Sequence, residues 1–207
     1  MTILFTADQH FGHANILKYE VDARLDDQGR TFDSVQQMDN ALVARWNAVV
    51  APEDTVYTLG DFSFKMHTIA EYLPLLNGKV VLIVGNHDPL FKHCVNGQLD
   101  HARARALEVG FADMHFEHLI EVEGLGLVKL SHFPYAPPDP EDEAFLRFEA
   151  LRPKPTGEAL LLHGHIHSQW LTRHYPNMPP MLNVGVDKHG LRPISATEVA
   201  TLVSGHE

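Results

Sequence analysis

Short apolar runs recur along the chain, and most of them end in a small cluster of Asp, Asn or His residues. These runs lie at residues 3–7, 56–59, 80–84, 127–130 and 160–162. At 3–5, 80–84 and 160–162 the apolar residues are continuous rather than alternating, which is typical of strands buried on both faces. The pattern therefore predicts a central sheet whose strands end in polar clusters.

Helical periodicity fills the intervals between the predicted strands. A helix is predicted over residues 35–49, where apolar side chains recur at Val35, Met38, Leu42, Trp46 and Val49. Asp33 and Gln36 have the spacing of a capping box at its start. Further helices are predicted over residues 68–76, 99–109 and 196–202. Alternation of strands and helices favours a layered α/β fold.

The second half of the chain is less regular. Residues 118–130 have the pattern of two antiparallel strands joined by a glycine-rich turn, which predicts mixed strand pairing. Residues 134–155 contain six prolines, and we expect them to form a loop over one edge of the site, with a short helix around 141–150. Because no repeat, low-complexity tract or linker is evident, residues 1–207 are expected to form a single domain.

Composition narrows the classes of function. A net charge of -11 argues against stable binding of duplex DNA, which depends on Lys and Arg, but it does not exclude a phosphate substrate. Cys94 is the single cysteine, so intramolecular disulfides and multi-cysteine zinc sites are excluded. No segment is long and apolar enough for a signal peptide core or a membrane span. We therefore expect a cytoplasmic protein with no membrane partner, while its oligomeric state stays open.

The polar clusters carry groups that bind metal ions. In an open α/β sheet the carboxyl ends of the strands face one crevice, so residues distant in sequence converge there. Histidine, present 15 times, is the commonest metal ligand, and a single carboxylate such as that of Asp61 can bridge two cations. The residues of these clusters that are of metal-binding type are Asp8, His10, Asp61, Asn86, His87, Asp88, His132, His163, His165 and His167.

The order of these clusters resembles the signature of the calcineurin-like metallophosphoesterase family. The matching elements are Asp8/His10, Gly60-Asp61, Gly85-Asn86-His87-Asp88, His132 and Gly164-His165-Ile166-His167. The resemblance implies a four-layer αββα sandwich of two mixed β-sheets flanked by helices, with two divalent metals at the strand carboxyl ends. By position, one ion would be held by Asp8, His10, Asp61 and His167. The second ion would be held by Asp61, Asn86, His132 and His165.

The same resemblance implies a reaction, hydrolysis of a phosphate ester by in-line attack of a metal-bridging hydroxide. His87 would contact the phosphate or protonate the leaving oxygen, and Asp88 would orient it as a general acid. Mixed nitrogen and oxygen ligands suit Mn, Fe, Zn or Ni, of which Mn is favoured. The expected substrate is a small phosphate ester or a nucleotide-type molecule, with a phosphodiester favoured over a phosphomonoester.

A longer segment after the first motif resembles a small bacterial and phage branch of that family with an HFGHxN-type extension. His13, Asn15 and Arg24 would line the substrate pocket, and Tyr135 is a further candidate for substrate binding. The alternative for His13 and Asn15 is a helix start, in which they cap backbone groups. For Arg24 and Tyr135 the alternative is a solvated or packing role. Asn183, in a later segment similar to that branch, is a candidate ligand or neighbour of one.

Three other functions remain open. The protein could be a phosphomonoesterase, a catalytically silent scaffold with the same fold, or a mononuclear metal hydrolase acting on an amide or ester. No expected ligand is replaced, which disfavours the scaffold, and Asp61 with Asn86 disfavours a mononuclear site. Protein without metal and without turnover would favour the scaffold. A metal-to-protein ratio near one would favour the mononuclear hydrolase.

Overall fold

The five apolar runs form strands that divide between two stacked sheets. The computed structural model describes residues 1–137 and 148–204. The first sheet has the order β10-β1-β2-β3-β4, and its strands are β1 (Ile3–Thr6), β2 (Thr55–Thr58), β3 (Lys79–Ile83), β4 (Asp113–His115) and β10 (Ile194–Ser195). Strands β1 to β4 run parallel, whereas β10 is antiparallel to β1.

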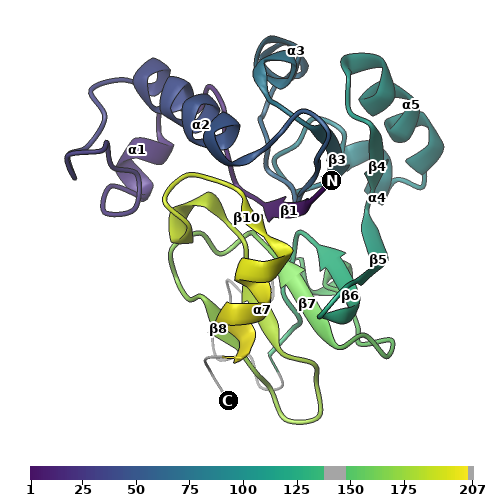
Figure 1. The fold of residues 1–207 in the computed structure, drawn as a ribbon. Helices are drawn as coiled ribbons and strands as arrows, with labels where there is room; N and C mark the ends of the chain where they lie inside the picture. Colours follow the sequence, from purple (N-terminus) through teal and green to yellow (C-terminus); the bar gives the residue numbers. More distant parts are fainter. Residues whose placement is uncertain (138–147, 205–207) are drawn as a thin grey trace.

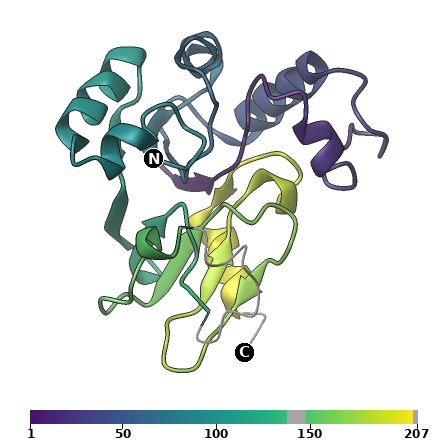
Figure 2. The same ribbon diagram turned by 180° about the vertical axis from the view of Figure 1, so that it is seen from behind.

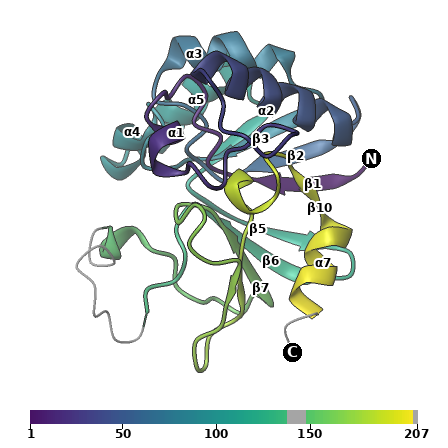
Figure 3. The same cartoon turned by 90° about the vertical axis from the view of Figure 1, so that its left-hand side faces the viewer.

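The second sheet is also mixed. Its order is β5-β6-β7-β9-β8, and its strands are β5 (Glu117–Val122), β6 (Gly126–Ser131), β7 (Leu160–His163), β8 (Thr172–Arg173) and β9 (Met181–Asn183). Strands β6, β7 and β9 run parallel, and β5 and β8 are antiparallel edges. Figure 3 shows this sheet lying below the first. Two mixed sheets flanked by helices confirm the expected α/β sandwich.

Most helices lie on the outer face of the first sheet. Seen from the front and from behind, α1 and α2 lie on one side, α3 in the middle and α4 with α5 on the other (Figures 1 and 2). Their bounds are α1 Ile16–Tyr19, α2 Val35–Val49, α3 Met66–Tyr72, α4 Phe91–Val95 and α5 Leu99–Val109. Helix α7 (Ala196–Ser204) follows β10 beside the second sheet. No helix in the described ranges has the length and hydropathy needed to cross a membrane.

Successive side chains of a strand in the first sheet contribute to two different apolar cores. Leu4 of β1 faces the helices, where it joins a core that includes Met38 and Trp46 of α2. Its neighbour Phe5 faces the second sheet and packs in a core that includes Leu130 and Leu162. Successive side chains of a strand point to opposite faces, so this alternation fixes both layers at once. The sandwich thereby holds the carboxyl ends of strands from both sheets at one edge.

The outer face of the second sheet is covered differently. Leu161 and Met181, which point away from the first sheet, form a small cluster with Tyr135. Loop residues Trp170 and Tyr175 pack on it. Among the described residues this cover is therefore built from loops, while α7 contributes Val199 to the core between the sheets.

The predicted helices are largely confirmed. The helices at 35–49 and 99–109 have the predicted bounds, and α7 is two residues longer than expected. Helix α3 begins two residues earlier than expected and continues as a 3₁₀ turn, Leu73–Leu75, because Pro74 cannot donate a helical hydrogen bond. The hairpin β5–β6 is confirmed. Most of the helix expected at 141–150 lies outside the described residues, and Glu149–Leu151 is a 3₁₀ turn.

The N-cap of α2 corrects the sequence prediction by one residue. Ser34, rather than Asp33, adopts extended backbone and accepts a hydrogen bond from the N–H of Gln37 at 3.2 Å. The Gln37 side chain in turn accepts from the N–H of Asp33 at 2.9 Å. The shift arises because both Asp33–Gln36 and Ser34–Gln37 fit the spacing, and spacing alone does not choose between them.

We expect Ser34→Ala to lower the free energy of unfolding by about 1 kcal/mol, because a cap acceptor is lost at an exposed helix start. Ser34→Asp keeps an acceptor at the same position and is the matched control, which should stay close to wild type. Urea unfolding followed by circular dichroism measures both. Equal destabilisation by the two variants would contradict the assigned cap.

Candidate metal centre

Five strands deliver the candidate ligands to one edge of the sandwich. Asp8 and His10 follow β1, Asp61 follows β2, and Asn86 follows β3 in the first sheet. In the second sheet, β6 ends directly before His132, and β7 ends two residues before His165 and four before His167. The segments are joined across the sheets, since the N–H of Gly164 donates to the carbonyl of His132 at 3.1 Å. The predicted convergence of strand ends is therefore present.

The backbone at these strand ends is strained. Eight non-glycine residues in the described ranges have positive φ, and five of them are candidate ligands: Asp8 (60°), His10 (53°), Asp61 (55°), His165 (73°) and His167 (50°). Left-handed backbone is uncommon for residues with a side chain, and it costs on the order of 1–3 kcal/mol for each residue. Such clustering is typical of functional sites, where surrounding structure holds the strained conformation.

Asp8, His10 and His167 form the first group of ligand-type atoms. One ligand atom from each lies within 4.8 Å of the others. The His10 imidazole is 2% exposed, and neither of its ring nitrogens has a hydrogen-bond partner. Burial, together with the neighbouring His167, lowers the pKa of His10 well below its usual value. A neutral, buried imidazole with unpartnered nitrogens fits a metal ligand, because a bound cation would accept the nitrogen lone pair that has no other partner.

Asp8, Asp61 and His132 form a second group within the same 4.8 Å limit. His132 Nδ1 lies 2.7 Å from the carbonyl oxygen of Leu59, so Nδ1 donates and Nε2 presents a lone pair. That Nε2 faces the Asn86 side-chain oxygen at 3.0 Å and an Asp61 oxygen at 3.5 Å. Burial lowers the pKa of His132, so the ring is neutral. Three acceptors directed at one another fit a divalent cation placed between them.

The shared carboxylate differs from the expectation in part. Asp8 belongs to both groups, whereas the sequence assigned only Asp61 to both ions. Asp61 still lies beside the first group, with an oxygen 3.7 Å from His10 Nε2. The ring of His165 lies 5.1 Å from that of His132, but its nitrogens are in neither group. Its backbone N–H donates instead to Asp8, at 3.0 and 3.2 Å.

The two buried carboxylates at this edge, Asp8 and Asp61, are desolvated. Burial raises the pKa of Asp8 to about 6 and that of Asp61 to about 7. Desolvation disfavours the charged form of a carboxylate, and a bound cation would reverse that shift by supplying positive charge. The donor set therefore fits divalent metals with mixed nitrogen and oxygen ligands.

His167 is oriented by a carboxylate. Its Nδ1 lies 2.8 Å from Asp187 Oδ2, which leaves Nε2 for a metal. Burial lowers its pKa, but the Asp187 hydrogen bond and the charge of Asp8 outweigh burial and raise the pKa to about 9. No role for Asp187 is evident in the sequence. A Gly-x-Asp sequence shortly after a strand carried no separate signal for this contact.

Arg24 lies behind the site rather than in a substrate pocket, which corrects our expectation. Its side chain is fully buried, and Nε donates to Asp187 Oδ1 at 2.7 Å. The two terminal nitrogens donate to the carbonyl oxygens of Gln9 and Asp8, at 2.9 and 2.6 Å, with weaker contacts to Met38 and Asp187. Every guanidinium nitrogen is thus used within the protein. Arg24 positions the strained segment and the carboxylate that orients His167.

Asp88 takes a different role from the expected one. Its two oxygens accept hydrogen bonds from four backbone N–H groups, those of Asp61, Phe62, Ser63 and Gly85, at 2.8 to 3.4 Å. These bonds tie the loop after β2 to the loop after β3. Because the carboxylate lone pairs are used by the backbone, Asp88 is a positioning residue rather than the partner that orients His87.

His87 lies exposed at the rim of the site. Its backbone N–H donates to Asp61 Oδ1 at 2.8 Å, and its ring lies 5.7 Å from that of His10 and 4.6 Å from that of Phe64. The imidazole therefore stands next to both ligand groups without belonging to either. Phe64 was not singled out in the sequence, because an isolated Phe after a strand indicates no particular role.

Tyr135 and Asn183 lie in different places and make different contacts. Tyr135 is buried on the outer face of the second sheet, where its hydroxyl donates to Glu158, so it makes no contact with the site and our substrate-binding expectation for it is wrong. Asn183 supports the strained His167, since its amide donates to the His167 carbonyl at 2.7 Å. His13 and Asn15 line a pocket beside the site.

Glycines bring the backbones together behind the ligands. A Cβ at Gly60 would lie 2.6 Å from His132 Nδ1, and one at Gly164 would lie 2.6 Å from an Asp8 oxygen. At Gly85 a Cβ would overlap the backbone nitrogen of Asp61. Any side chain at these positions would displace a candidate ligand. The glycines quoted in the sequence motifs are thus explained by close approach.

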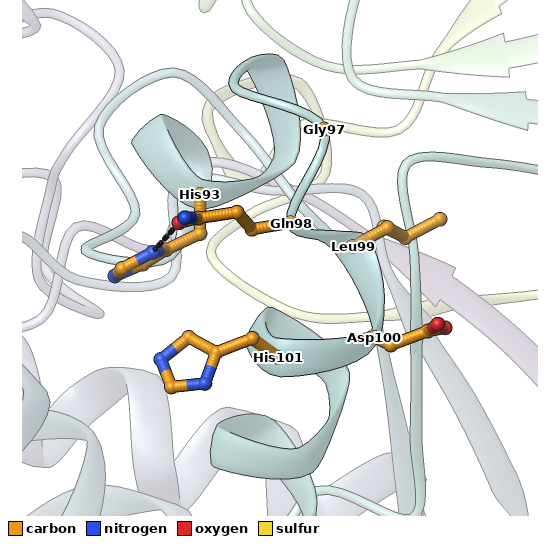
Figure 4. A pocket seen from close by; sticks show the side chains of 6 residues that line it. All are labelled: His93, Gly97, Gln98, Leu99, Asp100 and His101. Atoms are coloured by element: carbon orange, nitrogen blue, oxygen red, sulfur yellow. Dashed lines mark hydrogen bonds between the residues drawn. The ribbon is translucent and has the colours of Figure 1, made fainter.

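Another pocket, of about 550 Å³, lies between α4 and α5 and is separate from this edge (Figure 4). His93 and His101 line it, but Nδ1 of His93 is occupied by Gln98 at 2.8 Å. None of the candidate site residues lines this pocket.

Comparisons with known proteins place the chain in a family. It is 30% identical over 217 residues to the gene 66 protein of Mycobacterium phage L5, across 97% of this chain and 93% of the phage protein. It is 31% identical over 214 residues to the gene 66 protein of phage D29, across 99% and 97%. The chain belongs to the family of these gene 66 proteins. No family model matches it.

Similarity extends to cellular proteins. An uncharacterised protein of Methanocaldococcus jannaschii, MJ1445, is 28% identical over 207 residues, across 97% of this chain and 90% of that protein. The crystal structure of AQ665 from Aquifex aeolicus, a protein of unknown function, is similar with a TM-score of 0.64 and 25% identity over 97% and 98% of the chains. The phosphopantetheinyl hydrolase PptH of Mycobacterium tuberculosis is more distant, with a TM-score of 0.47 and 14% identity over 89% of each chain. Nothing about this chain's reaction follows from that last likeness.

Metal affinity is expected to rise with pH. Metals bind deprotonated ligands, and the pKa of about 9 at His167 means that a proton must leave when a metal binds below that pH. The affinity for Mn²⁺ should therefore rise by about tenfold per pH unit between pH 7 and 8.5, and more steeply below pH 7, where Asp61 is protonated as well. Competition with a chelator of known affinity at several pH values measures this slope.

His167→Asn should flatten the slope by about one proton, while His67→Ala, at an exposed position, serves as the control and should leave it unchanged. An affinity that is independent of pH, or that falls as pH rises, would contradict the assignment of His167.

Proposed function

We propose that the protein is a metal-dependent phosphoesterase of the calcineurin-like type that binds two divalent cations and hydrolyses a small phosphate ester. The observation that carries this proposal is the pair of ligand groups that share Asp8. Two three-ligand groups with a common carboxylate suit two cations a few ångströms apart, as two-metal phosphoesterases require. The order of the sequence motifs supports the same reaction.

When bound, the two cations would activate a water molecule, bind phosphate oxygens and stabilise in-line displacement at phosphorus. The first cation would be held by Asp8, His10 and His167, and the second by Asp61, Asn86 and His132, with Asp8 between them. Of these residues, the neutral imidazoles His10 and His132 supply lone pairs without having to lose a proton. His165, whose ring lies 5.1 Å from that of His132, is the remaining candidate for the second set.

His87 is the proposed general acid. It is exposed at the rim, its ring lies 5.7 Å from that of His10, and its backbone is fixed by Asp61. An imidazole at this place can hold a proton for the leaving oxygen. Asp88 and Arg24 act indirectly, since they hold the loops from which the ligands project.

A phosphodiester is favoured over a phosphomonoester, and Mn²⁺ is the favoured metal. A mononuclear hydrolase would use the first group alone, and a silent scaffold would use neither. The shared Asp8 disfavours the first alternative, and the unpartnered nitrogens of buried His10 disfavour the second. Metal stoichiometry and turnover distinguish all three.

The first test is metal reconstitution. Protein stripped with chelator and refilled with Mn²⁺ should bind about two ions per chain and hydrolyse bis-p-nitrophenyl phosphate faster than p-nitrophenyl phosphate. Asp61→Asn should lose at least about 100-fold in kcat/KM, because a ligand of the second cation is weakened. Asp100→Asn, an exposed carboxylate on α5, is the matched control and should retain activity.

Each possible outcome of this experiment favours a different function. One ion per chain with esterase or amidase turnover would favour the mononuclear hydrolase, and two ions with preferred monoester hydrolysis would favour a phosphomonoesterase. Folded, metal-free protein without turnover would favour the scaffold.

His87→Gln tests the proposed acid by its dependence on the leaving group. With an alkyl ester, whose leaving oxygen needs a proton, kcat/KM should fall by about 10²- to 10⁴-fold, whereas p-nitrophenolate leaves readily and should show a much smaller loss. The metal content should stay at the wild-type value. An equal loss with both leaving groups would instead assign His87 to phosphate binding.

A further inference from the structure

A pocket of about 270 Å³ lies beside the proposed active site, between the segment after β1 and the segment after β2. Its lining includes His13, Asn15, Phe64 and Lys65. Two of these, His13 and Phe64, have rings 5.6 Å from the ring of His10. The pocket therefore lies next to His10, a proposed metal ligand, because two of its lining residues have rings close to the His10 ring. A substrate bound through its phosphate at the metals would extend an organic group toward this space.

Phe64 supplies an aromatic surface at the mouth of the pocket. It is 36% exposed, although it stands among three imidazoles, with ring distances of 4.5 Å to His13, 4.6 Å to His87 and 5.6 Å to His10. Phe64 thus lies between the pocket and the proposed general acid. Exposed phenylalanine next to polar rings leaves apolar surface in water, which a flat ligand would cover.

His13 supplies a directional polar group. Its Nδ1 is buried and has no hydrogen-bond partner in the described part of the chain. A neutral imidazole offers one hydrogen-bond donor and one acceptor. An unpartnered buried nitrogen beside an exposed aromatic ring is the combination that recognises a heteroaromatic group, by stacking and by one hydrogen bond.

We propose that Phe64 and His13 form a subsite for a flat heteroaromatic group carried by the substrate, so that the enzyme acts on phosphate esters with such a ring. This inference rests on the proposed function for the position of the phosphate. Phe64 stacks on the ring, and His13 bonds to a polar edge of it. A volume of about 270 Å³ lies just below the range of pockets for drug-sized ligands, which suits one ring system with a short arm.

The test compares two phosphomonoesters, one with a heteroaromatic base and one without it. AMP and ribose 5-phosphate are titrated calorimetrically into Mn²⁺-loaded protein, and AMP should bind at least about tenfold more tightly. In Phe64→Leu the affinity for AMP should fall by about 5- to 100-fold, the range for loss of a stacking partner, while the affinity for ribose 5-phosphate stays unchanged. Phe64→Trp should restore the preference for AMP.

Tyr19→Leu is the matched control, since Tyr19 is an exposed aromatic residue outside this pocket, and it should leave both affinities unchanged. His13→Leu should weaken AMP binding without affecting ribose 5-phosphate. Equal binding of AMP and ribose 5-phosphate, or an equal loss of both in Phe64→Leu, would overturn the subsite.

The binding experiment is independent of turnover, so the two proposals fail separately. A preference for AMP that depends on Phe64, in a protein without phosphoesterase activity, would leave the subsite standing and remove the proposed reaction. Turnover of phosphodiesters with no preference for the ring would do the reverse.

Discussion

The main physical constraint on this structure is the repulsion between acceptor groups that are gathered at one edge of two stacked sheets. The rest of the structure has to offset that repulsion. Buried acceptor groups of His10, His132 and the carboxylates lie close to one another, and the side-chain oxygen of half-buried Asn86 lies 3.0 Å from His132 Nε2. Such an arrangement is costly in an apolar interior unless positive charge is supplied. Much of the surrounding architecture serves to keep these groups in place despite that cost. The apolar core between the sheets keeps the site rigid, and the strand ends direct its side chains toward one another.

Strain and its compensation are arranged around the same edge. Left-handed backbone at several ligands turns their side chains inward, and each such residue opposes folding. Buried polar side chains hold the strained segments by bonding to their backbone: Arg24 to the segment at Asp8, Asn183 to that at His167, and Asp88 to the loops after β2 and β3. The candidate ligands and the residues that hold them are thus joined by hydrogen bonds. The geometry of the candidate site depends on these supporting residues as much as on the candidate ligands.

The sequence located the candidate ligands that converge at this edge better than the residues that hold them in place. Strand ends and ordered motifs locate Asp8, Asp61 and the histidines, because parallel strands direct their carboxyl ends to one edge. Arg24 and Tyr135 were misplaced because sequence gives a residue type but not the direction of its side chain. Asp88 was misassigned because adjacency to His87 in the chain does not make a contact in space. Strands β8 and β10, with two residues each, are too short to show periodicity.

The ion pair between Arg24 and Asp187 joins residues 163 positions apart, close to the two ends of the chain. Contacts of such sequence separation form late, since a long loop must close before they contribute. A chain emerging from the ribosome therefore carries Asp8 and His10 long before the partner of Arg24 has been synthesised. The backbone segment that carries these two candidate ligands is therefore held by a pair whose second member comes from near the other end of the sequence.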